Sequence, residues 1–146
     1  MTECELNELC GQIIGACIDV HKSLGPGLLE NIYADCLAYE LELRKLRYRR
    51  EVVIPFIYKG REFSTRLKAD MIVENAIILE LKSVAELTTL YEAQLMTYLT
   101  LSGIELGLLI NFNVPLLKDG ITRMRINHGK MSKSDVDLLT KFHRDR

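Results

Sequence analysis

Besides Glu74 near its centre, three charged residues interrupt the mostly apolar stretch DMIVENAIILELKSV, which covers residues 70–84. They are Asp70, Glu80 and Lys82. Two carboxylates and an ammonium on one surface could bind a divalent metal through hard oxygen ligands and assist hydrolysis of a phosphodiester. The same three residues could instead form a structural ion-pair cluster on a solvent-facing sheet surface. The pattern by itself leaves both interpretations open.

The stretch is typical of a β-hairpin, and the length of its turn decides whether the charges meet. A two-residue turn would put Asp70 and Glu80 on opposite faces. A three-residue turn pairs Val73 with Ile77 and therefore brings Asp70 opposite Glu80. Asn75 suits the left-handed backbone that such a turn needs. We predict the three-residue turn, because it also collects one wholly apolar face from Leu67, Ala69, Met71, Val73, Ile77, Leu79 and Leu81.

In this register the two carboxylates face each other with their Cβ atoms about 5 Å apart. Like charges at that distance repel, and one of them tends to bind a proton unless a cation intervenes. Lys82 lies two residues from Glu80 on the same face, and Lys68 lies two residues from Asp70. The hairpin therefore predicts an acidic pair with cations beside it.

Two further motifs add polar residues at fixed spacing. In GPGLLENIY, Glu30 falls in the first turn of a predicted helix and begins an inward-facing stripe that continues through Tyr33. Its structural explanation is a capping-box position, with Gly27 as N-cap. In QLMTY, Gln94 and Tyr98 are four residues apart and so lie on one face of a helix.

Periodicity predicts the elements that must position these residues. We expect helices over 5–22 and about 28–46, two strands within 52–73 joined by a turn at Lys59-Gly60, and a third strand over 76–82. A helix over 88–103, strands over 106–112 and 120–127, and a terminal helix over 132–144 capped by Ser132 or Ser134 complete the order α-α-β-β-β-α-β-β-α. Pro55 indicates a sheet edge or a bulge. The order predicts an α/β fold, a mixed β-sheet flanked by α-helices.

The 146 residues, of which 48% are hydrophobic, predict a single domain over 1–146. No apolar stretch approaches the roughly 20 residues of a membrane span, so no membrane partner is expected. The acidic N-terminal stretch lacks the pattern of a signal peptide. The four cysteines show no metal-ligand spacing, which favours free thiols in a reducing compartment. Both observations lead us to expect a cytoplasmic protein.

Basic residues gather between residues 44 and 68, although the net charge of the chain is −1. This segment holds nine basic residues, Arg44, Lys45, Arg47, Arg49, Arg50, Lys59, Arg61, Arg66 and Lys68, against Glu51 and Glu62 alone. Such a stripe can contact phosphates. It can equally be an ordinary solvated surface, and charge alone does not decide between the two.

Together these motifs resemble a known family. Gly27, Glu30 and Tyr33 match the signature of the GxxExxY family, and the resemblance covers roughly residues 10–128. Asp70 followed by Glu80-Leu81-Lys82 resembles the core of the PD-(D/E)xK nuclease superfamily, although Ala69 stands where the superfamily name has proline. The residues Gln94 and Tyr98 resemble the QxxxY motif of its exonuclease-like branch.

The resemblance implies a restriction-endonuclease-like core that cleaves phosphodiesters with Mg²⁺ or Mn²⁺. By position, the metal ligands would be Asp70, Glu80 and the backbone carbonyl of Leu81. Lys82 would orient or activate the attacking water and offset charge on the phosphate. Glu30 would join the catalytic residues, directly or through water. The roles implied for Gln94 and Tyr98 are positioning the site or contacting the nucleic-acid backbone.

The expected function is therefore a metal-dependent nuclease, with DNA as the expected substrate and a possible homodimer that joins two basic stripes. Two alternatives keep the same fold. One is a non-catalytic module that binds nucleic acid or regulates another protein. The other is an interaction subunit that completes a larger enzyme. Metal-dependent cleavage distinguishes the first possibility from both alternatives.

Overall fold

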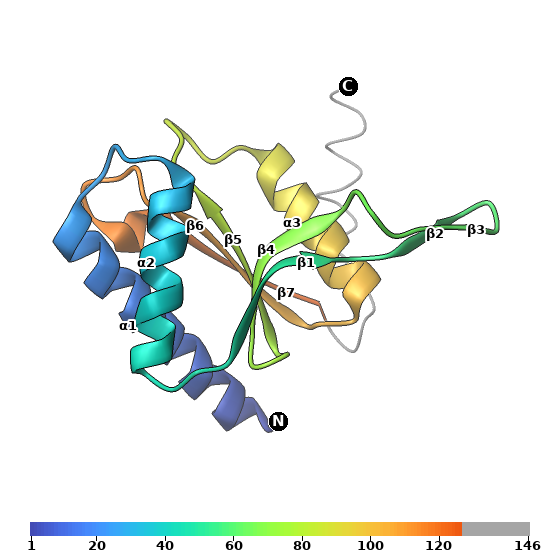
Figure 1. The fold of residues 1–146 in the computed structure, drawn as a ribbon, viewed down its shortest axis with the longest axis horizontal. Helices are drawn as coiled ribbons and strands as arrows, with labels where there is room; N and C mark the ends of the chain where they lie inside the picture. The colour runs from blue at the N-terminus through green and yellow to red at the C-terminus, as the bar shows by residue number, and fades with distance from the viewer. Residues whose placement is uncertain (127–146) are drawn as a thin grey trace.

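The computed structural model describes residues 1–126 (Figure 1). Within that range the chain forms three α-helices, seven strands and one short 3₁₀ helix. In chain order they are α1 (Glu3–Leu24), α2 (Glu30–Leu43), β1 (Tyr48–Val53), β2 (Phe56–Tyr58), β3 (Arg61–Phe63), β4 (Lys68–Val73), β5 (Ile77–Lys82), α3 (Thr89–Ser102), β6 (Leu106–Asn111), η1 (Leu117–Gly120) and β7 (Ile121–Arg125). The predicted terminal helix lies outside the described residues.

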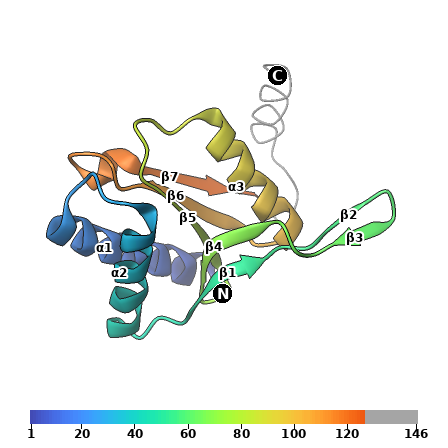
Figure 2. The ribbon, with the colours of Figure 1, turned by 45° about the horizontal axis from the view of Figure 1, so that its top comes forward.

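Five strands form one mixed sheet in the order β1-β4-β5-β6-β7, and β2 with β3 forms a separate two-stranded ribbon. Neighbouring strands of the large sheet are antiparallel except β5 and β6, which are parallel. A parallel pair needs a crossover, and α3 supplies it. Helices α1 and α2 lie on one face of the sheet and α3 on the other (Figures 1 and 2). This confirms the predicted mixed sheet flanked by helices, a restriction-endonuclease-like arrangement.

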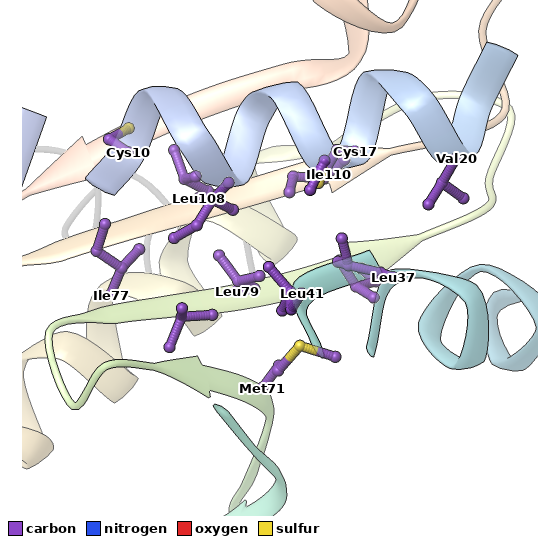
Figure 3. Packing of buried hydrophobic residues seen from close by; sticks show 14 of the residues in the cluster. Cys10, Cys17, Val20, Leu37, Leu41, Met71, Ile77, Leu79, Leu108 and Ile110 are labelled. Atoms are coloured by element: carbon purple, nitrogen blue, oxygen red, sulfur yellow. The ribbon is translucent and has the colours of Figure 1, made fainter. Parts of the chain in front are cut away.

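The larger core lies between the sheet and the α1–α2 pair (Figure 3). Cys10, Cys17 and Val20 of α1 meet Leu37 and Leu41 of α2 above Met71, Ile77, Leu79, Leu108 and Ile110 of the three central strands. A second core lies under α3 and includes Ile72, Ile78, Leu95, Leu99 and Leu109. Because both faces of the sheet are covered, every residue of β6 is buried.

The two strands predicted within 52–73 are each divided in the structure. The chain leaves the large sheet after Val53, at Ile54-Pro55, and re-enters it at Lys68. Proline cannot donate a hydrogen bond to the sheet, which explains a break at this position on the edge strand β1. The intervening residues form the ribbon, whose turn at Lys59-Gly60 confirms the predicted turn. No helix of the described part is long and apolar enough to cross a membrane.

Candidate active site

The β4–β5 hairpin has the predicted register. Met71 pairs with Leu79 and Val73 pairs with Ile77, which leaves three residues for the turn. Glu74 and Asn75 have φ values of 52° and 53°, so both occupy the left-handed region. The left-handed conformation of Asn75 is the one predicted for this turn. The paired register ends at Met71 and Leu79, and Asp70 and Glu80 are the next residues beyond it, at the open end of the hairpin.

The two carboxylates bind the main chain of the opposite strand. The amide of Asp70 donates to Oε1 of Glu80 at 3.0 Å, and the amide of Leu81 donates to Oδ2 of Asp70 at 2.8 Å. Side chains therefore take the place of ladder hydrogen bonds where the strands diverge. Because each carboxylate accepts a hydrogen bond from the main chain of the opposite strand, both side chains are held in fixed positions.

The predicted apolar face holds only in part. Met71, Val73, Ile77, Leu79 and Leu81 pack in the α1–α2 core as expected. The prediction is wrong for Ala69 and Leu67, which pack on the α3 side instead. The alternation of side chains between the two faces of β4 changes at Asp70. The ladder between β1 and β4 is interrupted at the same place, since residues 51 and 70 are not paired although their neighbours are. Glu51 opposite has a φ of 51°, a conformation that turns the strand locally.

Burial raises the pKa of both carboxyl groups. Glu80 is only 4% exposed, and burial first, then the charge of Asp70, raise its pKa to about 8. Burial also raises the pKa of Asp70, while the amide of Leu81 and the charge of Lys82 act in the opposite direction. The site therefore holds negative charge at neutral pH only at a cost, which a bound cation would remove.

Lys82 lies beside the pair, as predicted. Its charge favours the ionised form of both Asp70 and Glu80. The ammonium sits over the ring of Tyr91 at 4.8 Å from the centroid. An aromatic face attracts a cation without neutralising it. Tyr91 at the start of α3 therefore holds the lysine at the edge of the site, a contact that the sequence pattern did not indicate.

Glu30 is exposed and lines a small pocket together with Asp70 and Leu81. Its charge contributes to the raised pKa of Asp70. Within residues 1–126, however, no three His, Cys, Asp or Glu side chains converge closely enough to hold a metal ion. Glu30 thus borders the pocket without completing a three-carboxylate cluster with the hairpin pair.

The predicted capping role of Glu30 is wrong, because α2 begins at Glu30 itself with Leu29 as N-cap. The preceding Gly25 and Gly27 have φ values of 71° and 93°, which keeps the backbone outside the helix. Tyr33 fixes this loop: its hydroxyl donates to the carbonyl of Gly25 at 2.5 Å and accepts from the amide of Leu28 at 3.1 Å. Tyr33 thereby determines where α2 starts, and with it the position of Glu30.

Gln94 and Tyr98 lie on one face of α3, as predicted. The amide nitrogen of Gln94 donates to the hydroxyl of Tyr98 at 3.1 Å. Tyr98 is buried, and its pKa is raised first by burial and then by the charge of Glu80. The hydroxyl therefore lies near the carboxylate pair, while Gln94 is exposed. Gln94 and Tyr98 therefore connect the acidic site to the exposed surface of α3.

Glu51 also belongs to the site, although in the sequence it stands out only as one of two acids in the basic segment. It lines the pocket with Asp70, and its charge also raises the pKa of Asp70. A non-glycine residue at positive φ is strained, and such strain gathers at functional sites. Glu51 lies opposite Asp70 where β1 pairs with β4, and no sequence pattern indicated the register of these two strands.

The residues present suit a hard divalent cation. Asp70 and Glu80 each use one carboxylate oxygen in the main-chain hydrogen bonds, which leaves the second oxygen of each to a ligand. Carboxylate and carbonyl oxygens are the donors that Mg²⁺ and Mn²⁺ prefer. Mg²⁺ also keeps several water ligands, so two carboxylates and the Leu81 carbonyl would be a sufficient protein contribution.

Three arginines of the basic segment form ion pairs within the described residues, although the side chain of Arg47 stays 86% exposed. Arg44 pairs with Asp19 and Glu40, Arg47 with Glu74, and Arg50 with Asp35. These ion pairs link neighbouring elements, so the three arginines have partners within the protein. The basic residues of the β2–β3 ribbon and its root are exposed, and they remain candidates for contact with phosphates.

The mixed sheet, its crossover helix and the acidic hairpin define a nuclease-type α/β fold. A family model described as the PD-(D/E)XK nuclease superfamily matches residues 7–124, and the chain belongs to this superfamily. No curated protein is significantly similar to the chain in sequence. The crystal structure of SSO0001 is similar, with a TM-score of 0.46 and 22% identity over 80% of this chain. The matched region spans 58% of SSO0001, less than two thirds of its length.

Proposed function

We propose that this protein is a metal-dependent nuclease that hydrolyses phosphodiester bonds in DNA, with Mg²⁺ or Mn²⁺ as cofactor. The observation that carries the proposal is the carboxylate pair, Asp70 and Glu80, which is fixed by main-chain hydrogen bonds and has Lys82 beside it. Phosphodiester hydrolysis needs a Lewis acid, an oriented water molecule and positive charge near the phosphate. Residues able to supply each requirement lie at one end of one hairpin.

In this proposal Asp70, Glu80 and the Leu81 carbonyl hold the metal, which would polarise the phosphate and lower the pKa of water when bound. Lys82 orients the attacking water and stabilises charge that develops on the phosphate. Glu30 accepts a hydrogen bond from water in the pocket that it shares with Asp70. Gln94 on the surface of α3 contacts the substrate backbone, and Tyr98 keeps Gln94 in place through their hydrogen bond.

We further propose that the chain belongs to the GxxExxY branch of the superfamily. The structure gives the three residues of that signature separate physical roles. Gly27 adopts a φ of 93°, Tyr33 anchors the loop, and Glu30 starts the helix beside Asp70. In this proposal Gly27 and Tyr33 shape the loop, and Glu30 brings a carboxylate to the edge of the metal site.

The alternative is a non-catalytic nucleic-acid-binding module on the same fold. A pair of carboxylates that binds no metal would be a structural link between β4 and β5. The two functions differ in one measurable property, which is the dependence of the protein on a divalent cation.

The experiment is cleavage of labelled DNA and RNA by the purified protein with Mg²⁺, Mn²⁺ or EDTA, together with calorimetric titration of Mn²⁺. We expect metal-dependent cleavage by the wild type and neither cleavage nor Mn²⁺ binding by Glu80→Gln. Glu86→Gln is the matched control, because Glu86 is exposed and four residues beyond Lys82. Nucleic-acid binding that is unaffected by metal, without cleavage of either polymer, would establish the non-catalytic module instead.

A further inference from the structure

The β2–β3 ribbon leaves the large sheet and projects beyond the body of the molecule (Figures 1 and 2). Its strands are short, and Phe56 pairs with Phe63 while Tyr58 pairs with Arg61. Neither strand packs against the cores described above, and Ile57 and Tyr58 are 73% and 59% exposed. A projecting ribbon with exposed apolar residues contributes little to folding, so its composition calls for another explanation.

The ribbon and its root are strongly basic. Residues 56–68 hold four basic residues and one acidic residue, in a chain whose net charge is −1. The basic residues are Lys59, Arg61, Arg66 and Lys68, and all four are exposed. Within residues 1–126 none of them forms an ion pair, whereas Arg44, Arg47 and Arg50 are each paired with a carboxylate. Exposed cations without carboxylate partners suit a polyanionic ligand.

We infer that the ribbon is an arm that lies in the major groove of a DNA duplex and contacts the flanking phosphates. The inference rests on the proposed nuclease function and adds the surface that would hold the substrate. The major groove of B-DNA is about 12 Å wide and admits a two-stranded ribbon. The major groove of an RNA duplex is too deep and narrow for side chains to enter.

The aromatic residues favour duplex over single-stranded DNA. Phe56 and Phe63 stack on each other with centroids 5.2 Å apart, and the guanidinium of Arg61 lies over Phe63 at 5.5 Å. The ammonium of Lys59 lies over Tyr58 at 5.5 Å. Proteins that bind single strands use free aromatic faces for base stacking. Here each ring already has a partner within the ribbon.

The position of the root connects the arm to the site. Val53 pairs with Lys68, and the amide of Ile54 donates to the carbonyl of Leu67 at 2.8 Å, so the ribbon emerges in a fixed direction. Lys68 precedes Asp70 by two residues on β4, which is a separation of about 7 Å along a strand. A duplex held by the ribbon and by Lys68 would therefore have a phosphate near the carboxylate pair.

The test is binding measured by fluorescence anisotropy in EDTA, so that cleavage does not contribute. The probe is a DNA duplex of about 20 base pairs, roughly 70 Å long, compared with one of its single strands and with an RNA duplex of the same sequence. The ribbon variant is Lys59→Asn with Arg61→Gln and Arg66→Gln. Lys59 and Gly60 have φ values of 49° and 83°, a turn that Asn-Gly favours, so this variant keeps the hairpin.

The matched control removes three exposed lysines elsewhere, as Lys22→Gln, Lys45→Asn and Lys118→Gln. Asparagine is chosen at Lys45 because its φ is 59°. We expect the ribbon variant to bind the DNA duplex roughly tenfold or more weakly, with a salt-dependence slope smaller by about 2–3. We expect the control to bind within roughly twofold of the wild type, and the wild type to prefer the DNA duplex over the other two probes.

Equal losses of affinity for the DNA duplex in the ribbon variant and in the control would overturn the inference. It would also fail if the wild type preferred a single strand or RNA, or if light scattering showed a dimer that only the ribbon variant loses. If the ribbon variant binds the duplex as the wild type does, while Asp70→Asn abolishes metal-dependent cleavage, the arm is refuted and the nuclease function stands. Absence of any binding by the wild type would refute both.

Discussion

The amide of Asp70 donates to a carboxylate oxygen of Glu80 at 3.0 Å across the open end of the β4–β5 hairpin. This hydrogen bond orients the buried Glu80 carboxyl, and the amide of Leu81 orients Asp70 in the same way. Both carboxyl groups are thus positioned before any ligand binds. Preorganised ligands lose little entropy when a metal enters, which is the property that a catalytic metal site requires.

The isosteric changes Asp70→Asn and Glu80→Gln test the metal site without removing these hydrogen bonds. The amide oxygen of each new side chain can still accept from the main chain, so we expect both variants to fold. Loss of either negative charge should abolish Mn²⁺ binding and reduce cleavage to background, since a neutral amide is a weak ligand for a hard cation. Calorimetry and a cleavage assay measure these effects, and unchanged cleavage by both variants would contradict the site.

The pH dependence of stability tests the raised pKa of Glu80. Its pKa is about 8 in the folded, metal-free protein and about 4.3 in an unfolded chain. Between these values the folded state binds more protons than the unfolded state. The contribution of Glu80 to stability should therefore be greatest below pH 4.3 and should fall as the pH rises towards 8. Asp70 shifts in the same direction. Urea unfolding in EDTA at several pH values measures the fall.

The variant Glu80→Gln provides the control for this pH dependence. It lacks the titrating group, so its stability should change less between pH 5 and pH 8 and exceed that of the wild type at pH 8. Added Mn²⁺ should stabilise the wild type at pH 8 and leave the variant unchanged, because ligands stabilise only the state that binds them. A wild type as stable at pH 8 as at pH 5 without metal would show that the two carboxylates are not destabilising.

Lys82→Met separates metal binding from catalysis. Methionine keeps an unbranched side chain against Tyr91 but removes the charge, so the fold and the metal ligands should remain. We expect cleavage to fall by roughly 10²-fold or more, a magnitude typical of losing one group that stabilises transition-state charge. Mn²⁺ affinity should be retained. Lys118→Met, which changes an exposed lysine, is the control, and equal activities of the two variants would contradict a catalytic role for Lys82.

Tyr33→Phe tests the loop that precedes α2. The change removes one hydroxyl and with it the hydrogen bonds to Gly25 and Leu28, while the ring can still stack on Phe112 at 4.4 Å. We expect a loss of about 1–3 kcal/mol in the free energy of unfolding. Tyr39→Phe on the same helix is exposed and should cost nothing measurable. Urea unfolding distinguishes the two, and equal stabilities would mean that the hydroxyl does not hold the loop.

Much of the hairpin could be predicted from local pattern alone. Strand residues alternate with a period of two, so only one register places the apolar residues near the turn on one face, and this register brings Asp70 to Glu80. The helix over Thr89–Ser102 was also predictable, because Gly103 suits the left-handed C-cap that ends it. In both cases the deciding interactions join residues that are near in sequence.

The remaining features depend on contacts between distant segments. The sequence pattern predicted the three helices of the described residues, the β4–β5 hairpin and the residues of the acidic pair, but not the division of the two strands before Asp70. Packing of the folded chain places Glu51 opposite Asp70, Tyr91 under Lys82 and Tyr33 against Phe112. The same packing pairs some arginines with carboxylates and leaves other basic residues on a projecting ribbon. These contacts could not be predicted because pairing between non-adjacent elements depends on how the whole chain packs, and no local periodicity encodes it.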